Sequence, residues 1–155
     1  MIVLIDNGHG AETPGKKSPN GRLKEWSYTR QIAAQVVNQL KAKGIDARLL
    51  VPEDRDVPLS ERCRRANAVC ATAGTGNVIL VSIHCNASGP GDTWRKPDGW
   101  SVFLHPNASM QSKALATKVF EAASAQGLKC RVQAPDRKYW TMNLAICRDT
   151  RCPAI

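Results

Sequence analysis

Apolar and polar positions alternate between two periods along the chain. Short apolar runs at residues 2–5 and 78–83 predict buried strands, of which the second is the most hydrophobic. Residues 45–51 alternate and then run apolar, which predicts a further strand. Apolar residues spaced by three and four predict amphipathic helices, and they lie at residues 32–40, 59–70 and 115–123. This order of strands and helices predicts an α/β fold, with a mostly parallel, mixed sheet covered by helices on both faces. We expect residues 78–83 to form the central strand.

Local signals set the ends of the predicted helices. The first helix is expected to begin at Glu25, where a carboxylate suits the helix dipole, and to stop at Gly44. In the second helix we expect Ser60 to act as the N-cap and Leu59 to face inward. The third helix is expected over roughly residues 109–126. Glycine- and proline-rich segments at 11–24 and 85–99 predict two long loops, and long loops in compact domains are usually functional.

Length and hydropathy indicate one globular domain over residues 1–155. The chain has 155 residues, enough for one core, and it shows no internal repeat. No apolar run approaches the roughly 20 residues of a membrane span, so we expect no membrane insertion. Met1 leads straight into the first predicted strand without a basic segment and cleavage site, so we expect no signal peptide.

Charge indicates a class of binding partner, and cysteine spacing indicates the state of the thiols. The formal net charge is +9, which predicts attraction to a polyanion: nucleic acid, an anionic membrane or a bacterial wall. The basic residues are spread from Lys16 to Arg151 without interleaved aromatic residues, so no nucleic-acid partner is expected. The six cysteines form no Cys-x-x-Cys pair and are expected to be free thiols.

Two histidines stand where predicted strands end. His9 follows residues 2–5 within a glycine-rich turn, and His84 follows residues 78–83; a long loop comes after each. In a mostly parallel sheet these strand ends lie on the same edge, outside which ligands bind. We therefore expect the two imidazoles to converge. Oligomeric state is not indicated by any of these patterns.

A catalytic zinc site needs three protein ligands and an open position, so a carboxylate is missing from this pair. Glu25 is the first candidate, because a right-handed crossover brings the start of its helix to the same edge; Glu12 is the competitor. His105 also ends a predicted strand, but its turn-like neighbours favour a role at the surface or behind the ligands. Cys85 should point to the opposite face from His84, which argues against thiolate ligation.

Further polar residues flank the two histidines. Asp6, Asn7 and Asn86 are candidates for hydrogen bonding to the imidazoles and fixing their tautomers. Capping of strand ends and turns is an equally good interpretation of the same three residues. Arg62 and Asn67 are interpreted as structural residues that tie the second helix to the sheet.

Four segments of the chain, taken in order, resemble the motifs of the type-3 family of zinc-dependent N-acetylmuramoyl-L-alanine amidases. The Ser-Ile-His-x-Asn-Ala motif is the most specific of them. The matching segments are Val3–Gly10 (VLIDNGHG), Lys24-Glu25, Arg62 with Ala66-Asn67, and Ser82–Ala87 (SIHCNA). The resemblance implies one zinc ion held by His9, Glu25 and His84. It implies that the substrate is peptidoglycan, cut at the amide between N-acetylmuramic acid and L-alanine.

One part of the family pattern is not matched. Relatives carry a catalytic glutamate in the form Pro-Ala-x-x-x-Glu, whereas this sequence ends at Pro153-Ala154-Ile155. We therefore expect residues 1–155 to stop before the last strand and its glutamate, and assign no catalytic residue. The alternative is a non-catalytic module that binds the cell wall with the same fold. The expected location is the wall or periplasm, reached by phage-type release or as part of an exported parent protein.

Overall fold

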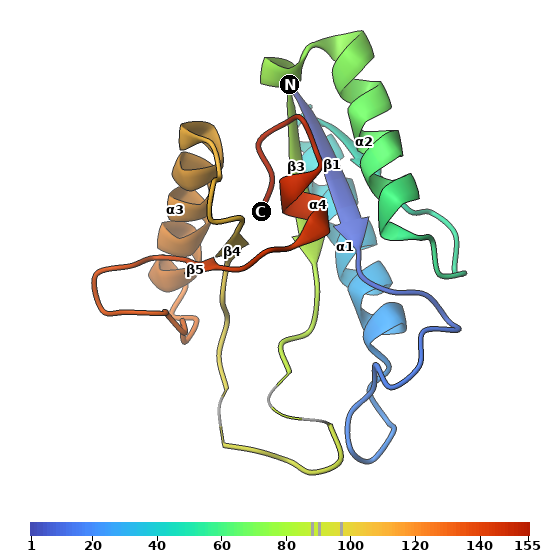
Figure 1. The fold of residues 1–155 in the computed structure, drawn as a ribbon, viewed down its shortest axis with the longest axis vertical. Coiled ribbons are helices and arrows are strands. Elements are labelled where there is room, and N and C mark those ends of the chain that lie inside the picture. The colour runs from blue at the N-terminus through green and yellow to red at the C-terminus, as the bar shows by residue number, and fades with distance from the viewer. Residues whose placement is uncertain (88, 90, 97) are drawn as a thin grey trace.

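A three-stranded parallel sheet forms the centre of the molecule (Figure 1). The computed structural model describes residues 1–155 except 88, 90 and 97. The strands are β1 (Ile2–Asn7), β2 (Asp46–Leu49) and β3 (Val78–Ile83), in the order β2-β1-β3. They confirm the three predicted strands, and the parallel pairing confirms the predicted α/β class.

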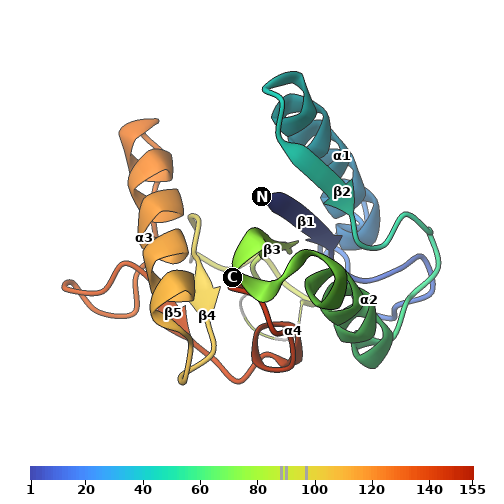
Figure 2. The same ribbon diagram turned by 90° about the horizontal axis from the view of Figure 1, so that it is seen from above.

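Two long helices cover opposite faces of this sheet (Figure 2). Helix α1 (Glu25–Ala42) packs Ala33 and Val37 against Val3 and Ile5 of β1. Helix α2 (Leu59–Ala73), which a 3-10 turn at Thr75–Asn77 connects to β3, packs on the other face, where Leu4 lies. Successive side chains of β1 point to opposite faces, and a helix covers each face. This is why β1 carries a continuous apolar run.

The register of the parallel strands brings two chain segments to the same edge. Ile2 lies opposite Val78, and the pairing continues until Asn7 lies opposite Ile83. The N–H of Gly8 then donates a 2.9 Å hydrogen bond to the carbonyl of Ile83. The turn after β1 and the loop after β3 consequently leave the sheet at the same level.

The second half of the chain adds a smaller layer beside β3. It consists of β4 (Phe103–Leu104), α3 (Met110–Ala125) and β5 (Trp140–Thr141), whereas α4 (Ala145–Arg148) packs against α2 through Ile146. Helix α3 starts where predicted, because the Ser109 side chain accepts a hydrogen bond from the Ser112 N–H as an N-cap. The last residues run beside β3: Ala154 pairs with Leu80 in parallel, and the Ser82 N–H donates to the carbonyl of Ile155.

Some local predictions were wrong. Strand β1, and not β3, is the middle strand of the three, although β3 has Ala154 on its other side. Helix α2 begins at Leu59 after Pro58, without a side-chain cap, so Ser60 is not the N-cap. Proline can supply the fixed backbone angle at this start without a capping hydroxyl. Leu59 is 53% exposed, because it lies in the first turn at the rim of a cavity rather than over the sheet.

No described helix combines the length and the apolar character needed to cross a membrane. Among the described residues, all six cysteines are free thiols. The predicted loop at 85–99 contains no helix or strand in its described part, and residues 88, 90 and 97 fall outside the description.

Candidate metal centre

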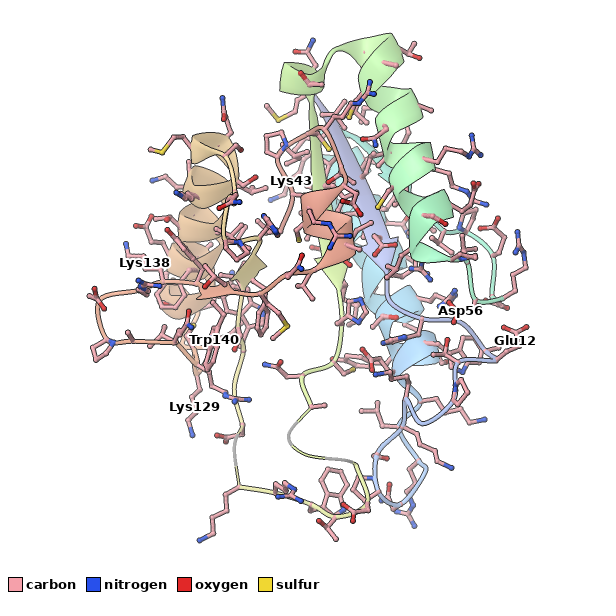
Figure 3. The ribbon with its side chains drawn as sticks, viewed as in Figure 1. Glu12, Lys43, Asp56, Lys129, Lys138 and Trp140 are labelled. Atoms are coloured by element: carbon pink, nitrogen blue, oxygen red, sulfur yellow. The ribbon has the colours of Figure 1, made fainter. Side chains whose placement is uncertain are left out.

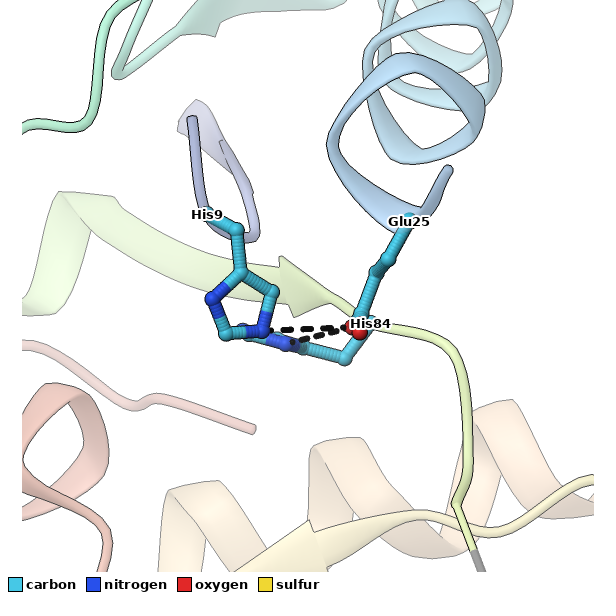
Figure 4. A group of neighbouring side chains, drawn as sticks. All are labelled: His9, Glu25 and His84. Atoms are coloured by element: carbon cyan, nitrogen blue, oxygen red, sulfur yellow. Dashed lines mark hydrogen bonds and ion pairs between the residues drawn. The ribbon is translucent and has the colours of Figure 1, made fainter. Parts of the chain in front are cut away.

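Three side chains from three separate segments meet at the carboxyl edge of the sheet (Figure 4). They are His9 in the turn after β1, Glu25 at the first position of α1, and His84 directly after β3. One potential ligand atom from each of them lies within 4.8 Å of the others. It is the only such group of three metal-ligating residues found among the described residues.

The distances between these ligand atoms suit a metal ion with tetrahedral coordination. Oε1 of Glu25 lies 3.0 Å from Nδ1 of His84 and 3.4 Å from Nε2 of His9. Ligands about 2.0–2.1 Å from a zinc ion at tetrahedral angles are separated by about 3.3 Å. The two imidazoles meet edge to face, with ring centroids 4.8 Å apart. Two nitrogen donors and one carboxylate are also a donor set found in catalytic zinc sites.

Glu25 is held as a carboxylate. Burial by itself would raise its pKa, but hydrogen bonds from His84, His9 and the Cys85 N–H lower the pKa well below its ordinary value. The Cys85 N–H donates to the same Oε1 atom at 2.9 Å. The side chain of Glu25 is 11% exposed and that of His84 is 46% exposed, so the group is open to solvent on the His84 side.

The two glycines beside His9 each leave space for a neighbouring group. A Cβ atom at position 8 would overlap the imidazole of His84, and one at position 10 would overlap the backbone of Asp56. His9, between them, has a φ of 62°, and it is the only described residue other than glycine with a positive φ. Such a left-handed conformation costs roughly 1–2 kcal/mol for a residue with a side chain. The predicted glycine-rich turn is therefore required by close packing on both sides of His9.

A buried ion pair lies behind the turn. Nη1 of Arg62 in α2 donates to Oδ1 of Asp6 at 2.8 Å and to the carbonyl of Asn7 at 2.6 Å. The other oxygen of Asp6 accepts from the Ser82 hydroxyl at 2.6 Å, which joins β1 to β3. Arg62 thus ties α2 to the sheet, as predicted. Asn67 instead binds the chain near the C-terminus, through Asp149 and Arg151.

Two of the three residues predicted to fix the tautomers form hydrogen bonds to other groups. Asp6 binds Arg62 and Ser82, and the Asn86 side chain donates to the hydroxyl of Ser101 at 3.2 Å. The side chain of Asn7 is fully buried and has no hydrogen-bond partner among the described residues. No hydrogen bond within the described structure joins these three side chains to either imidazole, so their predicted role stays a prediction.

None of the competing candidates, Glu12, His105 and Cys85, belongs to the ligand group found among the described residues. Glu12 is exposed, and its carboxylate accepts a hydrogen bond from the backbone of Asp56, beside which it lies (Figure 3). His105 accepts a hydrogen bond from the Asn107 N–H within a turn. Burial and the charge of Glu25 raise the pKa of the Cys85 thiol to about 11, and its sulfur is not part of the ligand group found among the described residues.

Two residues that contact the turn around His9 were not predicted from the sequence. The hydroxyl of Thr29 donates to the carbonyl of Gly8 at 3.1 Å, and Nη1 of Arg30 donates to the carbonyl of His9 at 3.0 Å. Thr29 lies on the buried stripe of α1, so a polar residue on an apolar face was an available signal. Arg30 gave no signal, because an arginine beside the apolar stripe of a helix is ordinary.

A cavity of about 880 Å³ opens beside the two histidines. It extends between β3 and the smaller layer, and its walls are mainly apolar. The lining includes Trp100, Leu144 and Ile155 together with His9 and His84. A substrate group bound there would lie next to the candidate metal ligands and would be partly shielded from water.

Nearly the whole chain matches one known family by sequence. Residues 3–155 match the family described as Amidase_3, N-acetylmuramoyl-L-alanine amidase. N-acetylmuramoyl-L-alanine amidase AmiC of Neisseria meningitidis serogroup B is 36% identical over 86 residues, which are 56% of this chain and 19% of that protein. N-acetylmuramoyl-L-alanine amidase AmiA of Escherichia coli K12 is 33% identical over 131 residues, which are 83% of this chain and 42% of that protein.

Solved structures of amidases share the fold. The N-acetylmuramoyl-L-alanine amidase from Clostridium difficile 630 superposes with a TM-score of 0.80 at 27% identity, covering 99% of this chain and 75% of that one. The catalytic domain of CwlV, from Bacillus (Paenibacillus) polymyxa var. colistinus, gives a TM-score of 0.75 at 25% identity, covering 99% of this chain and 76% of that one. The chain spans less than half the length of the curated relatives it matches.

Proposed function

The chain belongs to the N-acetylmuramoyl-L-alanine amidase family, and from this premise we propose that it hydrolyses the amide between N-acetylmuramic acid and L-alanine in peptidoglycan. We propose further that one zinc ion assists the reaction, held by His9, Glu25 and His84. The observation that carries this proposal is the single oxygen of Glu25 that lies 3.0 and 3.4 Å from nitrogens of the two histidines.

The three residues of the group contribute two kinds of ligand atom. His9 and His84 offer imidazole nitrogens as ligands, and Glu25 adds a negatively charged carboxylate oxygen that attracts the cation. When bound, zinc supplies Lewis-acid chemistry, polarising the scissile carbonyl and making water a better nucleophile. The cavity beside the histidines is suited to hold the substrate amide and to exclude bulk water.

Proton transfer to the leaving amine requires a further acid–base group. Ala154 pairs with Leu80 in a parallel register. In a strand continuing in that register, the fourth residue after Ala154 would lie level with His84. The glutamate of the family pattern Pro-Ala-x-x-x-Glu falls at this position. We propose that the carboxylate required for turnover acts from there, in a parent protein longer than residues 1–155.

A second candidate function is wall binding without turnover. The formal net charge of +9 favours it, because bacterial walls carry anionic polymers. Such a module would sediment with purified peptidoglycan sacculi and would release no new amine groups. Binding of this kind would weaken as the salt concentration rises.

The test is digestion of purified sacculi by the protein within its parent chain. The proposed reaction frees the α-amino group of L-alanine, so amine-reactive labelling followed by acid hydrolysis should yield labelled alanine. Metal analysis of the untagged protein should find one zinc per chain, and His84→Ala should lose both zinc and activity. His105→Ala is the matched control, because that imidazole lies in a turn outside the ligand group.

Each result separates the candidate functions. Labelled alanine that depends on His84 supports the amidase. Sedimentation with sacculi but no labelled alanine, with or without bound zinc, would contradict the amidase and favour the binding module. Activity that survives His84→Ala would contradict the assignment of the metal ligands.

A further inference from the structure

Both peptide groups that flank His9 are fixed by side chains from helices. The carbonyl of Gly8, which belongs to the peptide group before His9, accepts a hydrogen bond from the Thr29 hydroxyl at 3.1 Å; the same hydroxyl lies 3.3 Å from the carbonyl of Trp26. The carbonyl of His9 accepts from Nη1 of Arg30 at 3.0 Å and from Nη2 of Arg62 at 3.1 Å. Two guanidinium groups, one from α1 and one from α2, therefore converge on a single carbonyl oxygen.

We propose that Thr29, Arg30 and Arg62 are positioning residues that hold His9 in its left-handed conformation, so that its imidazole meets Glu25 and His84. This inference rests on the proposed metal site. The three residues act on the backbone of His9 and do not touch its ring. The orientation of the peptide group before His9 sets φ, and that of the peptide group after it sets ψ, so hydrogen bonds to both groups fix the two dihedral angles.

The donors themselves are rigidly held. Arg30 also donates to the carbonyl of Glu53, from Nη2 at 2.7 Å and from Nε at 3.1 Å, and stacks over Trp26. Arg62 donates from Nε to the carbonyl of Val57 at 2.8 Å and from Nη1 to Asp6. A donor fixed at several points loses little freedom when it binds one more acceptor. The hydrogen bonds to His9 are therefore part of a preformed frame.

The hydrogen bonds from Thr29, Arg30 and Arg62 oppose the conformational preference of His9 itself. With a φ of 62°, His9 adopts a conformation that a residue with a Cβ atom disfavours. A right-handed conformation would turn the Cβ bond away from its present direction and move the imidazole from Glu25, whose Oε1 lies 3.4 Å from Nε2. Charged donors form stronger hydrogen bonds than neutral ones, which suits them to oppose this strain.

Thr29 and Arg30 allow the frame to be tested. Thr29→Val keeps the size of the side chain and removes the hydroxyl donor, and Thr29→Ser restores it. Arg30→Lys keeps the charge but replaces the branched guanidinium that reaches His9, Glu53 and Trp26. Arg65→Lys is the matched control, because Arg65 also joins a helix to Glu53 and to the carbonyl of Leu50 but does not contact His9.

The first measurement is the dissociation constant for zinc, from competition with a chelating dye. Loss of residues that orient metal ligands typically weakens binding about 10- to 100-fold, and we expect this range for Thr29→Val and Arg30→Lys. Thr29→Ser should recover most of the affinity. Arg65→Lys should leave affinity unchanged within about two-fold while lowering the melting temperature of the metal-free protein. Equal affinities in the wild-type, Thr29→Val and Arg65→Lys proteins would overturn the positioning role and leave the metal site standing.

The second measurement is independent of metal. Backbone NMR chemical shifts of residues 8–10 in the metal-free protein report φ and ψ, and those of His9 should move away from left-handed values in Thr29→Val and Arg30→Lys only. If the wild-type protein binds no zinc, the proposed function fails, and these shifts decide the positioning role alone. Shifts of residues 8–10 that match wild type in both variants would overturn the inference.

Discussion

Nδ1 of His84 lies 3.0 Å from Oε1 of Glu25, although the two residues are 59 positions apart in the sequence. The contact exists because β3 ends at the edge of the sheet where α1 begins. The same carboxylate oxygen also lies 3.4 Å from His9. One carboxylate therefore links the two histidines, and Glu25 is the residue on which the candidate metal centre depends most directly.

Replacement of Glu25 should separate it from its competitor Glu12. Glu25→Gln keeps the shape of the side chain but removes the negative charge, so we expect zinc affinity to fall at least about 100-fold. Glu12→Gln should leave zinc affinity unchanged, because that carboxylate binds the backbone of Asp56. Isothermal titration or dye competition measures both. Equal losses in the two variants would contradict the assignment of Glu25.

Alanine at the two glycines beside His9 should have different effects. In Gly8→Ala the new Cβ atom overlaps the imidazole of His84, a side chain that can rotate, so we expect loss of zinc affinity with a smaller loss of stability. In Gly10→Ala the new Cβ atom overlaps the backbone of Asp56, which cannot rotate away. We expect about 1–3 kcal/mol of destabilisation there.

Urea unfolding and zinc titration of both glycine variants distinguish these outcomes. Gly76→Ala is the control, because a Cβ atom at position 76 meets nothing within 4 Å. Zinc affinity that survives Gly8→Ala would show that His84 does not bind through the ring position seen here.

The buried pair of Arg62 and Asp6 should contribute strongly to stability. The two side chains are 3% and 1% exposed and lie 2.8 Å apart. Arg62→Met leaves the Asp6 carboxylate buried without its partner, which should cost about 3–5 kcal/mol of unfolding free energy. Adding Asp6→Asn should recover part of that loss, because no unpaired charge then remains.

A double-mutant cycle by urea unfolding measures the coupling of this pair. The exposed pair of Arg48 and Asp46, 50% and 46% exposed, is the comparison. We expect Arg48→Met to change the unfolding free energy by less than about 1 kcal/mol. Additive effects of Arg62→Met and Asp6→Asn would contradict the coupling.

Acid should weaken the contact of Glu53 with Arg65. Hydrogen bonds from Arg65 lower the pKa of Glu53 to about 2 in the folded protein. In an unfolded chain a glutamate has a pKa of about 4.3. The contact between Glu53 and Arg65 therefore stabilises the fold above that pH, and this stabilisation is lost as the pH falls toward about 2. Glu53→Gln should therefore reduce the dependence of stability on pH between these values. Thermal melts from pH 5 to pH 2 measure this, and an unchanged slope would contradict it.

Much of the fold was predictable because it depends on local periodicity. The apolar run at 78–83 became β3 with the same bounds, and the spacing of apolar residues placed α1 from Glu25 onward. Helix starts were less predictable. A helix capped by Ser60 would begin at Glu61, but α2 begins two residues earlier, at Leu59, which is exposed. The burial of a first-turn residue depends on what packs beyond the helix, which a local pattern does not contain.

The sequence by itself determined which residues are candidate ligands: a histidine after each of two apolar runs, and a glutamate at a helix start. The tertiary structure decided that Glu25 rather than Glu12 joins the histidines, because the register of β1 and β3 sets both strand ends level beside α1. It also decided how His9 is held. Hydrogen bonds from Thr29, Arg30 and Arg62 reach backbone carbonyls, and every residue carries a carbonyl. No side-chain pattern can mark such an acceptor before the chain has folded.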